Sequence, residues 1–147
     1  MTTFPLAHSR ALWHSRGMKL LLLCLSLIAS SSHAETAMSA VEFDSYSRGK
    51  TFYYGSATGP YGAEEYLDNR RVRWSFLDGK CKDGSWYEDR GQICFTYEDN
   101  PDPQCWSFFK SPTGLIARFE NDPTQTELYE VNNSDKPMMC LGPEIGV

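Results

Sequence analysis

Histidine is missing from most of this 147-residue chain. Its three histidines, His8, His14 and His33, all lie in the first 34 residues, which we predict below to be removed. The remaining chain then has no imidazole for a Ser-His-Asp or Cys-His nucleophile, for proton transfer near neutral pH, or for a zinc site with histidine ligands. Carboxylate pairs, Ser-Lys dyads and tyrosines are the catalytic chemistry that remains.

Two further absences narrow the class of protein. No Cys-x-x-Cys pair occurs, which argues against a redox motif or a zinc ribbon. Basic residues are also scarce: beyond residue 34 the chain has 11 Lys and Arg against 19 Asp and Glu, a net charge of −8. Binding to nucleic acid or to an anionic membrane requires a basic face, so we expect neither as a partner. The sequence indicates no cofactor.

The first 34 residues have the pattern of an export signal. Met18 and Lys19 precede the apolar run LLLLCLSLIAS, which is too short to span a bilayer as a mature helix. Small residues follow, and we predict cleavage after Ala34. The pattern leaves open whether translation starts at Met1 or at Met18. We expect a periplasmic or secreted protein with no membrane span after processing.

The cysteines beyond residue 34 predict disulfides. Their even number behind an export signal allows three pairings. In GQICFTYEDNPDPQCWSFFK, residues 91–110, two aromatic runs flank an acidic, proline-containing break. If the break is a hairpin turn centred near residues 99–101, residues that face each other have numbers summing to 199 or 200. That register pairs Cys94 with Cys105, and Cys81 with Cys140 follows by elimination.

The same break also offers oxygen ligands. Glu98, Asp99, Asn100 and Asp102 place four oxygen-bearing side chains within five residues, which a calcium ion would favour. Two prolines interrupt the stretch, and the spaced Asp-x-Asp-x-Asp-Gly pattern is absent. We therefore predict an ordinary solvated turn and no metal site.

The rest of the chain predicts an antiparallel all-β fold. Turn signals recur every 8 to 12 residues between aromatic and β-branched runs. Alternation of period two places one set of residues on one face of each strand: Val72, Trp74 and Phe76; Ile93, Phe95 and Tyr97; Leu115, Ala117 and Phe119. We count about eight strands, near residues 50–54, 62–67, 70–77, 80–87, 91–98, 104–110, 114–120 and 126–131.

Short links between these strands predict a meander of hairpins. So many strands must curl, so we predict an up-and-down, lipocalin-like small barrel, with a small β-sandwich as the alternative. Residues 35–47 are expected to form a lead-in with one short helical turn. Residues 48–147 would form a single disulfide-stapled β domain.

Aromatic and acidic side chains are the candidates for a site. Beyond residue 34 the chain has three Trp, eight Tyr and seven Phe, and Tyr and Trp combine apolar bodies with polar tips, as ligand pockets require. Of the adjacent Glu64 and Glu65, period two turns one inward beside aromatics, where its pKa would rise. The alternative is a glutamate tied to Arg71 or Arg73. The predicted ligand-pocket residues are Trp74, Trp86, Trp106, Tyr66 and Glu64.

Several strings of the sequence resemble a family of small secreted proteobacterial proteins that is catalogued as a domain of unknown function. They are YGAEEYLDNRRVRWSF, GSWYE, ICFTYED, QCWSFF and CLGPEIGV, and the likeness covers most of residues 48–147. The resemblance implies an exported single β domain with cysteines. It implies no activity for any residue.

These observations favour a non-catalytic binding module. Its partner would be a small or glycan ligand in an aromatic-lined barrel, or an envelope protein. A deep cavity lined by Trp and Tyr would favour the ligand, whereas a filled barrel with an exposed apolar patch would favour the protein. The alternative is a carboxylate-only hydrolase such as a glycosidase, which would use Glu64 or Glu65 with a second acid.

Overall fold

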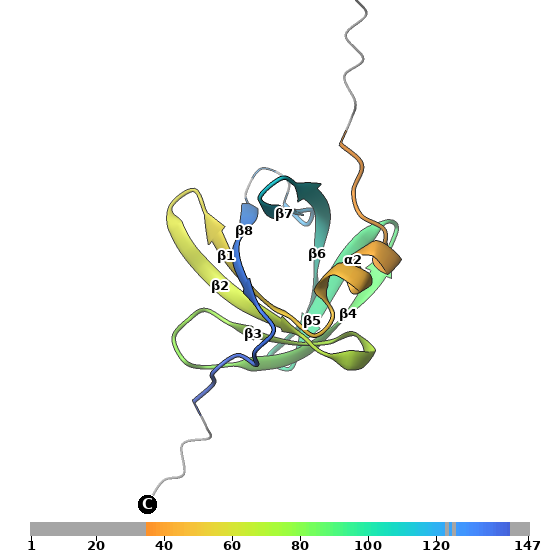
Figure 1. The fold of residues 1–147 in the computed structure, drawn as a ribbon. Helices are drawn as coiled ribbons and strands as arrows, with labels where there is room; N and C mark the ends of the chain where they lie inside the picture. Colours follow the sequence, from red (N-terminus) through yellow and green to blue (C-terminus); the bar gives the residue numbers. More distant parts are fainter. Residues whose placement is uncertain (1–34, 123, 125, 142–147) are drawn as a thin grey trace, which may run out of the picture. The chain divides into compact units, whose positions relative to one another are not determined.

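Eight antiparallel strands form a closed barrel in the computed structural model, which describes residues 35–122, 124 and 126–141. Each strand pairs with the next along the chain, and β8 pairs with β1 (Figure 1). The prediction of an all-β meander that closes into a small barrel is confirmed. The β-sandwich alternative is wrong, because the β1–β8 ladder leaves no open edge.

The predicted export signal lies outside the described residues. The strands are β1 (Thr51–Ser56), β2 (Gly59–Tyr66), β3 (Arg71–Ser75), β4 (Lys82–Asp89), β5 (Gln92–Tyr97), β6 (Asn100–Ser111), β7 (Gly114–Phe119) and β8 (Glu127–Ser134).

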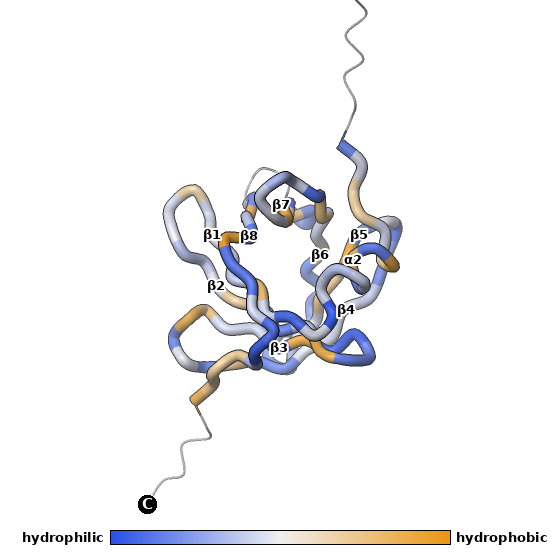
Figure 2. Tube along the Cα trace, viewed as in Figure 1, coloured by the Kyte–Doolittle hydropathy of each residue, from blue (hydrophilic) through white to orange (hydrophobic). Residues whose placement is uncertain are grey.

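The predicted alternation places apolar side chains inside the barrel. Val72 of β3, Ile93 of β5 and Leu115 of β7 are each only 1% exposed. The polar residues that alternate with them give the strands their mixed hydropathy in Figure 2. This period-two pattern fixes the register of each strand, because a slip of one residue would turn its apolar set toward water.

Two disulfides join elements of the barrel, with both of the predicted pairings. Cys94 and Cys105 face each other across the β5–β6 ladder and are bonded. Cys81, just before β4, bonds to Cys140 in the tail after β8. The Leu141 amide also donates to the Gly79 carbonyl at 2.7 Å, so the tail is held against the β3–β4 connection.

The predicted lead-in forms more structure than one helical turn. Ser39 and Glu42 make a capping box, and the helix α2 (Ala40–Ser47) starts there. The Phe43 ring of α2 is fully buried. It packs edge-on against Tyr66 and Trp86, at centroid distances of 5.5 and 5.3 Å. The helix is therefore part of the barrel core.

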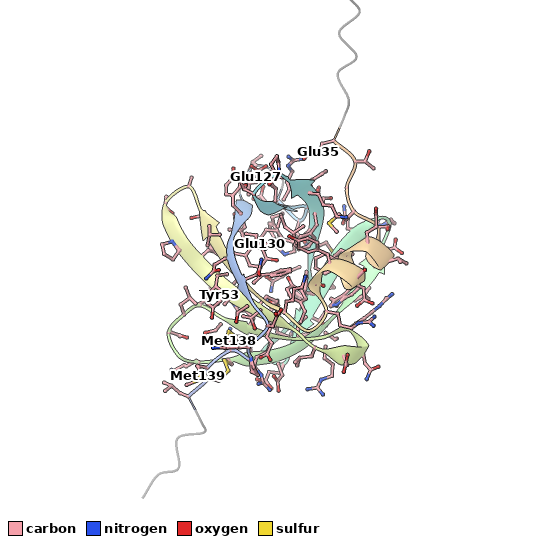
Figure 3. All side chains as sticks on the ribbon, viewed as in Figure 1. Glu35, Tyr53, Glu127, Glu130, Met138 and Met139 are labelled. Carbon is pink, nitrogen blue, oxygen red and sulfur yellow. A yellow bond between two sulfur atoms is a disulfide. The ribbon has the colours of Figure 1, made fainter. Side chains whose placement is uncertain are left out.

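Hydrogen bonds fix α2 in place. The Met38 amide donates to the Phe108 carbonyl of β6 at 2.7 Å. The Tyr46 hydroxyl donates at 3.0 Å to the buried carboxylate of Glu130, which Figure 3 labels on β8. The same Glu130 oxygen accepts from the Leu115 amide of β7 at 2.9 Å. These bonds hold the helix across the strands from both sides.

The two ends of the barrel differ in what closes them. In an antiparallel meander the β1–β2, β3–β4, β5–β6 and β7–β8 connections share one end. The β2–β3, β4–β5 and β6–β7 connections share the other, together with the chain segment between α2 and β1. Phe43 closes the interior toward this second end, so a site inside the barrel must open at the first.

Candidate functional site

The barrel interior contains a cavity of about 460 Å³. This volume lies within the range of about 300 to 1,000 Å³ that is typical of small-molecule sites. Strands from all around the barrel contribute to its wall, and most of the contributing side chains are aromatic. The lining residues are Tyr54, Tyr61, Glu64, Tyr66, Trp74, Phe76, Lys82, Phe95, Tyr97, Asp99, Asn100, Gln104, Trp106, Phe108, Ala117, Phe119 and Leu128.

The floor of the cavity is made by rings that rest on helix α2. Tyr66, Phe95 and Phe108 line the cavity, and each also contacts the Phe43 ring, with centroids 5.5, 6.4 and 4.4 Å away. Phe43 itself does not line the cavity. The helix thus acts as a plug that separates the cavity from the second end of the barrel.

One wall of the cavity near its mouth is an aromatic triplet on β2 and the end of β3. Trp74 lies 5.3 Å from Phe76 and 5.9 Å from Tyr61, measured between ring centroids. Phe76 remains 53% exposed although it lines the cavity, which places it at the opening. Trp106 and Phe119, whose centroids are 4.9 Å apart, form a second pair on β6 and β7.

Glu64 is the buried carboxyl group of the cavity. It is 3% exposed, and its Oε2 accepts a hydrogen bond of 2.8 Å from the Tyr97 hydroxyl. Its Oε1 is buried and has no hydrogen-bond partner among the described residues. Burial raises the pKa of Glu64 from 4.5 to about 8, and the Tyr97 bond offsets part of this rise. The carboxyl group is therefore mostly neutral at pH 7.

Besides Tyr97, two further tyrosines, Tyr54 and Tyr66, line the cavity that contains this carboxyl group. Tyr54 and Tyr66 share a hydrogen bond of 2.9 Å between their hydroxyl oxygens. Burial raises the pKa of Tyr54, Tyr66 and Tyr97 above the ordinary value, and the nearby Glu64 charge raises each of them further. All three phenols stay neutral near pH 7, so among these four groups Glu64 is the one whose charge can change there.

Glu64 and Glu65 face opposite sides of β2, as period two requires. Glu65 is also buried, but its carboxylate lies 3.9 Å from Arg73 and accepts from the Met138 amide of the tail at 3.3 Å. Both alternatives in the sequence are thus realised, each by a different residue. Glu64 is the inward glutamate beside aromatics, and Glu65 is the one tied to an arginine.

An ion pair bridges the cavity rim. Lys82, at the start of β4, pairs with Asp99 in the β5–β6 turn, and its amino group also lies 5.6 Å from the Phe76 ring. The acidic break contains the turn of the predicted disulfide-pinned hairpin, but the turn is formed by Glu98 and Asp99, and the rest of the break, which was expected at the turn, already belongs to β6. Asp99 and Asn100 of the break also line the cavity, which the sequence did not indicate.

Two glycines make room for the aromatic walls. A Cβ on Gly62 would lie 2.2 Å from the Trp74 ring, and a Cβ on Gly84 would lie 2.7 Å from the Tyr97 ring. Contacts this short do not occur, so both rings occupy space that only glycine leaves open. Gly62 thereby positions a cavity tryptophan, and Gly84 positions the partner of Glu64.

Four of the five predicted pocket residues line one cavity: Trp74, Trp106, Tyr66 and Glu64. Trp86 lies elsewhere. It is 3% exposed, packs against Phe43, and its ring is covered by the Arg70 guanidinium at 4.6 Å. The helix that sequence reasoning took for a lead-in explains this, because Trp86 packs on α2.

Comparison of the chain with protein-family models, with curated proteins and with solved structures finds no match. The resemblance to a family of small secreted proteins therefore stays a prediction. In the described part of the chain, no helix is long and apolar enough to cross a membrane.

Proposed function

We propose that this chain is an exported, non-catalytic binding module that takes a small ligand into the barrel cavity. The observation that carries the proposal is the cavity itself, with its aromatic walls and a single buried carboxyl group. Apolar pockets with a few convergent polar groups are the usual form of small-molecule sites. Trp and Tyr faces suit ligands with a flat or apolar body.

The cavity favours a small ligand over a protein partner. A filled barrel would have favoured a protein partner, and here the interior contains a cavity of about 460 Å³. Of the large apolar side chains on the outside, Val41 on α2 and Val131 on β8 lie on different elements, whereas Leu77 and Met139 line one hollow between the β3–β4 connection and the tail. Singly exposed apolar residues need no partner to explain them.

The cavity also favours ligand binding over an enzyme that hydrolyses its substrate with a pair of carboxyl groups. A glycosidase-like site requires two acids that act on the same bond. Glu65 faces away from Glu64, and Asp99, the other acid in the cavity wall, is paired with Lys82. Glu64 alone supplies a recognition group rather than an acid–base pair.

Export is part of the proposal. Two disulfides suit an oxidising compartment, and residues 1–34 have the pattern of an export signal. The intact mass of denatured protein from its own host tests this. We expect a chain that begins at Glu35 and whose mass is lower by four hydrogen atoms than that of the fully reduced chain, because two disulfides have formed. A mass that includes residues 1–34, or free thiols, would contradict export.

Ligand binding is tested by titration with N-phenyl-1-naphthylamine, a neutral aromatic dye that fluoresces in apolar surroundings. The titration uses the Trp86→Phe variant, in which the described tryptophans are the two that line the cavity, Trp74 and Trp106. We expect one dye per protein and energy transfer from these tryptophans to the dye. No binding, or binding without transfer, would overturn the proposal.

A matched pair of variants locates the dye. Ala117 is 2% exposed and lines the cavity, so Ala117→Trp fills the space. Val131 is 65% exposed on the barrel exterior, so Val131→Trp adds the same ring outside. We expect at least tenfold weaker dye binding for Ala117→Trp and none of this loss for Val131→Trp. If Ala117→Trp fails to fold, Leu128→Phe narrows the cavity more gently. Equal affinity in a folded, filled variant would overturn the cavity assignment.

A further inference from the structure

We infer that the ligand of this cavity carries a positive charge, and that Glu64 is its counterion. The ligand class is a small organic cation, an amine or a quaternary ammonium group joined to an apolar or aromatic body. This inference rests on the proposed function and names the chemistry of its ligand.

The first observation is the unsatisfied oxygen of Glu64. Oε1 is buried and unpaired within the described chain, while Oε2 is held by Tyr97. A buried polar atom without a partner is destabilising, so such atoms are rare in folded proteins and call for an explanation. A ligand that supplies a charge or a donor at this carboxyl group explains it.

The second observation is the absence of a countercharge for Glu64 within the wall. Among the described residues that line the cavity, Lys82 is the one basic side chain, and it pairs with Asp99 at the rim. A buried carboxylate is costly unless a cation pairs with it, and without one the group keeps its proton. An anionic ligand would meet Glu64 without any unpaired base, so the site disfavours carboxylates and phosphates.

The third observation is the wall itself. The faces of Trp, Tyr and Phe rings attract cations through their quadrupoles, and groups of such rings recognise quaternary ammonium ligands. The triplet of Tyr61, Trp74 and Phe76 lies on one side of the cavity, and the pair of Trp106 and Phe119 lies on β6 and β7. Rings and carboxyl group together form a wall that suits a cation with an apolar body.

The charge of the protein acts in the same direction. Residues 35–147 carry a net charge of −8, and such a field raises the local concentration of cations around the protein. The excess of Asp and Glu residues therefore does more than keep the protein soluble, because their negative field attracts the proposed cationic ligand toward the barrel.

Binding of a cation must release a proton. Glu64 is mostly neutral at pH 7, and only its ionised form pairs with a positive charge. The raised pKa values of Tyr54, Tyr66 and Tyr97 keep these three phenols neutral between pH 6 and 8. At the rim Lys82 forms an ion pair with Asp99, and Tyr61 lies in the wall beside Trp74. The released proton thus comes from Glu64.

The test compares two isosteres as competitors of the dye. Benzyltrimethylammonium is a permanent cation, and neopentylbenzene has the same shape without the charge. For the wild type we expect the affinity of the cation to rise about tenfold per pH unit up to pH 8 and to level off above it. The neutral isostere should bind equally at every pH. Calorimetry in two buffers at pH 7 should show close to one proton released per cation bound.

The matched variants are Glu64→Gln and Glu65→Gln. Glutamine at position 64 still accepts a hydrogen bond from Tyr97, but its amide group cannot ionise. The cation should therefore bind at least tenfold more weakly at pH 8, and its affinity should not depend on pH. Glu65→Gln makes the same change on the other face of β2 and should leave binding as in the wild type. An affinity for the cation that is flat with pH in the wild type, or unchanged in Glu64→Gln, would overturn the inference.

The outcomes also separate this inference from the proposed function. If dye and neopentylbenzene bind but the cation does not, the cavity is a neutral apolar site and only the inference fails. If none of the three compounds binds, the proposed function fails with it.

Discussion

Tyr97 of β5 donates a hydrogen bond of 2.8 Å to Glu64 of β2, although the two strands are not neighbours in the barrel. The bond therefore crosses the interior and joins two parts of the wall that are 33 residues apart in sequence. It holds one oxygen of a buried carboxyl group while the other has no partner among the described residues. This pair of residues gives the cavity its polar end and its response to pH.

Stability of the ligand-free protein should fall as the pH rises from about 5 to 8. The pKa of Glu64 is about 8 in the folded chain against an ordinary 4.5, so the folded state keeps a proton that the unfolded state releases. The stabilising contribution is fully present below pH 4.5 and is lost as the pH rises through about 8. The free energy of unfolding should decrease by about 1.4 kcal/mol per pH unit in this window.

Urea unfolding of Glu64→Gln checks this slope. The variant has no proton to exchange at this position, so its stability should change much less between pH 5 and 8. Glu65→Gln serves as the control and should keep the slope of the wild type. A slope that persists in Glu64→Gln would show that another group causes it.

Removal of the Tyr97 hydroxyl should raise the pKa of Glu64. The hydrogen bond from Tyr97 favours the charged carboxylate, and Tyr97→Phe removes it while keeping the ring in the wall. A bond of about 1 kcal/mol corresponds to a shift on the order of one pH unit. Carbon NMR titration of the glutamate carboxyl groups, assigned with Glu64→Gln, measures the midpoint. An unchanged or lower midpoint would contradict the role of this bond.

The two disulfides should differ in their contributions to stability. Cys94 and Cys105 are 11 residues apart, and Cys81 and Cys140 are 59 apart. In the chain-entropy model, the short loop contributes about 3 kcal/mol and the long loop about 4 kcal/mol. Replacing each pair by serine and comparing denaturant midpoints tests the order. A larger loss from the Cys94–Cys105 pair would mean that the hairpin needs its disulfide for more than loop closure.

Gly62→Ala should displace Trp74 from the cavity wall. The new Cβ would meet the Trp74 ring at 2.2 Å and the Ser75 carbonyl oxygen at 2.8 Å. Overpacking of this kind costs about 1 to 3 kcal/mol. We expect that loss in urea unfolding, a changed tryptophan emission in the Trp86→Phe background, and weaker dye binding. Gly55→Ala is the control, because its Cβ would meet the end of the exposed Val131 side chain at 3.0 Å and the Gly59 carbonyl oxygen at an ordinary 3.6 Å. Equal effects of the two substitutions would argue against a specific role for Gly62.

The strands and the Cys94–Cys105 disulfide could be predicted because they depend on local patterns, and the Cys81–Cys140 disulfide then followed by elimination. Alternation in RVRWSF and GLIARFE identified the inward faces, and turn residues marked the hairpin ends. A hairpin register about the acidic break also predicts Cys94 opposite Cys105, as the β5–β6 ladder has it. A meander makes this possible, because each strand pairs with its sequence neighbour and only the β1–β8 closure is distant.

The helix and the cavity's finer features could not be predicted in this way. The capping box of Ser39 and Glu42 is a local signal for the start of α2, but the packing of Trp86 on this helix, away from the predicted pocket, is a tertiary contact. The Glu64–Tyr97 bond and the Lys82–Asp99 pair each join residues that only the closed barrel brings together. The space that Gly62 leaves for the Trp74 ring on the next strand likewise depends on three-dimensional packing, so the sequence alone does not reveal it.

Native mass spectrometry of the protein purified from its own host tests the central claim most directly. The wild type should carry an extra mass in its native spectrum that disappears on denaturation, and the cavity-filling Ala117→Trp variant should be bare. The account predicts that this mass belongs to a small organic cation. A bare wild type, or the same adduct on a folded Ala117→Trp variant, would contradict ligand binding in the barrel cavity.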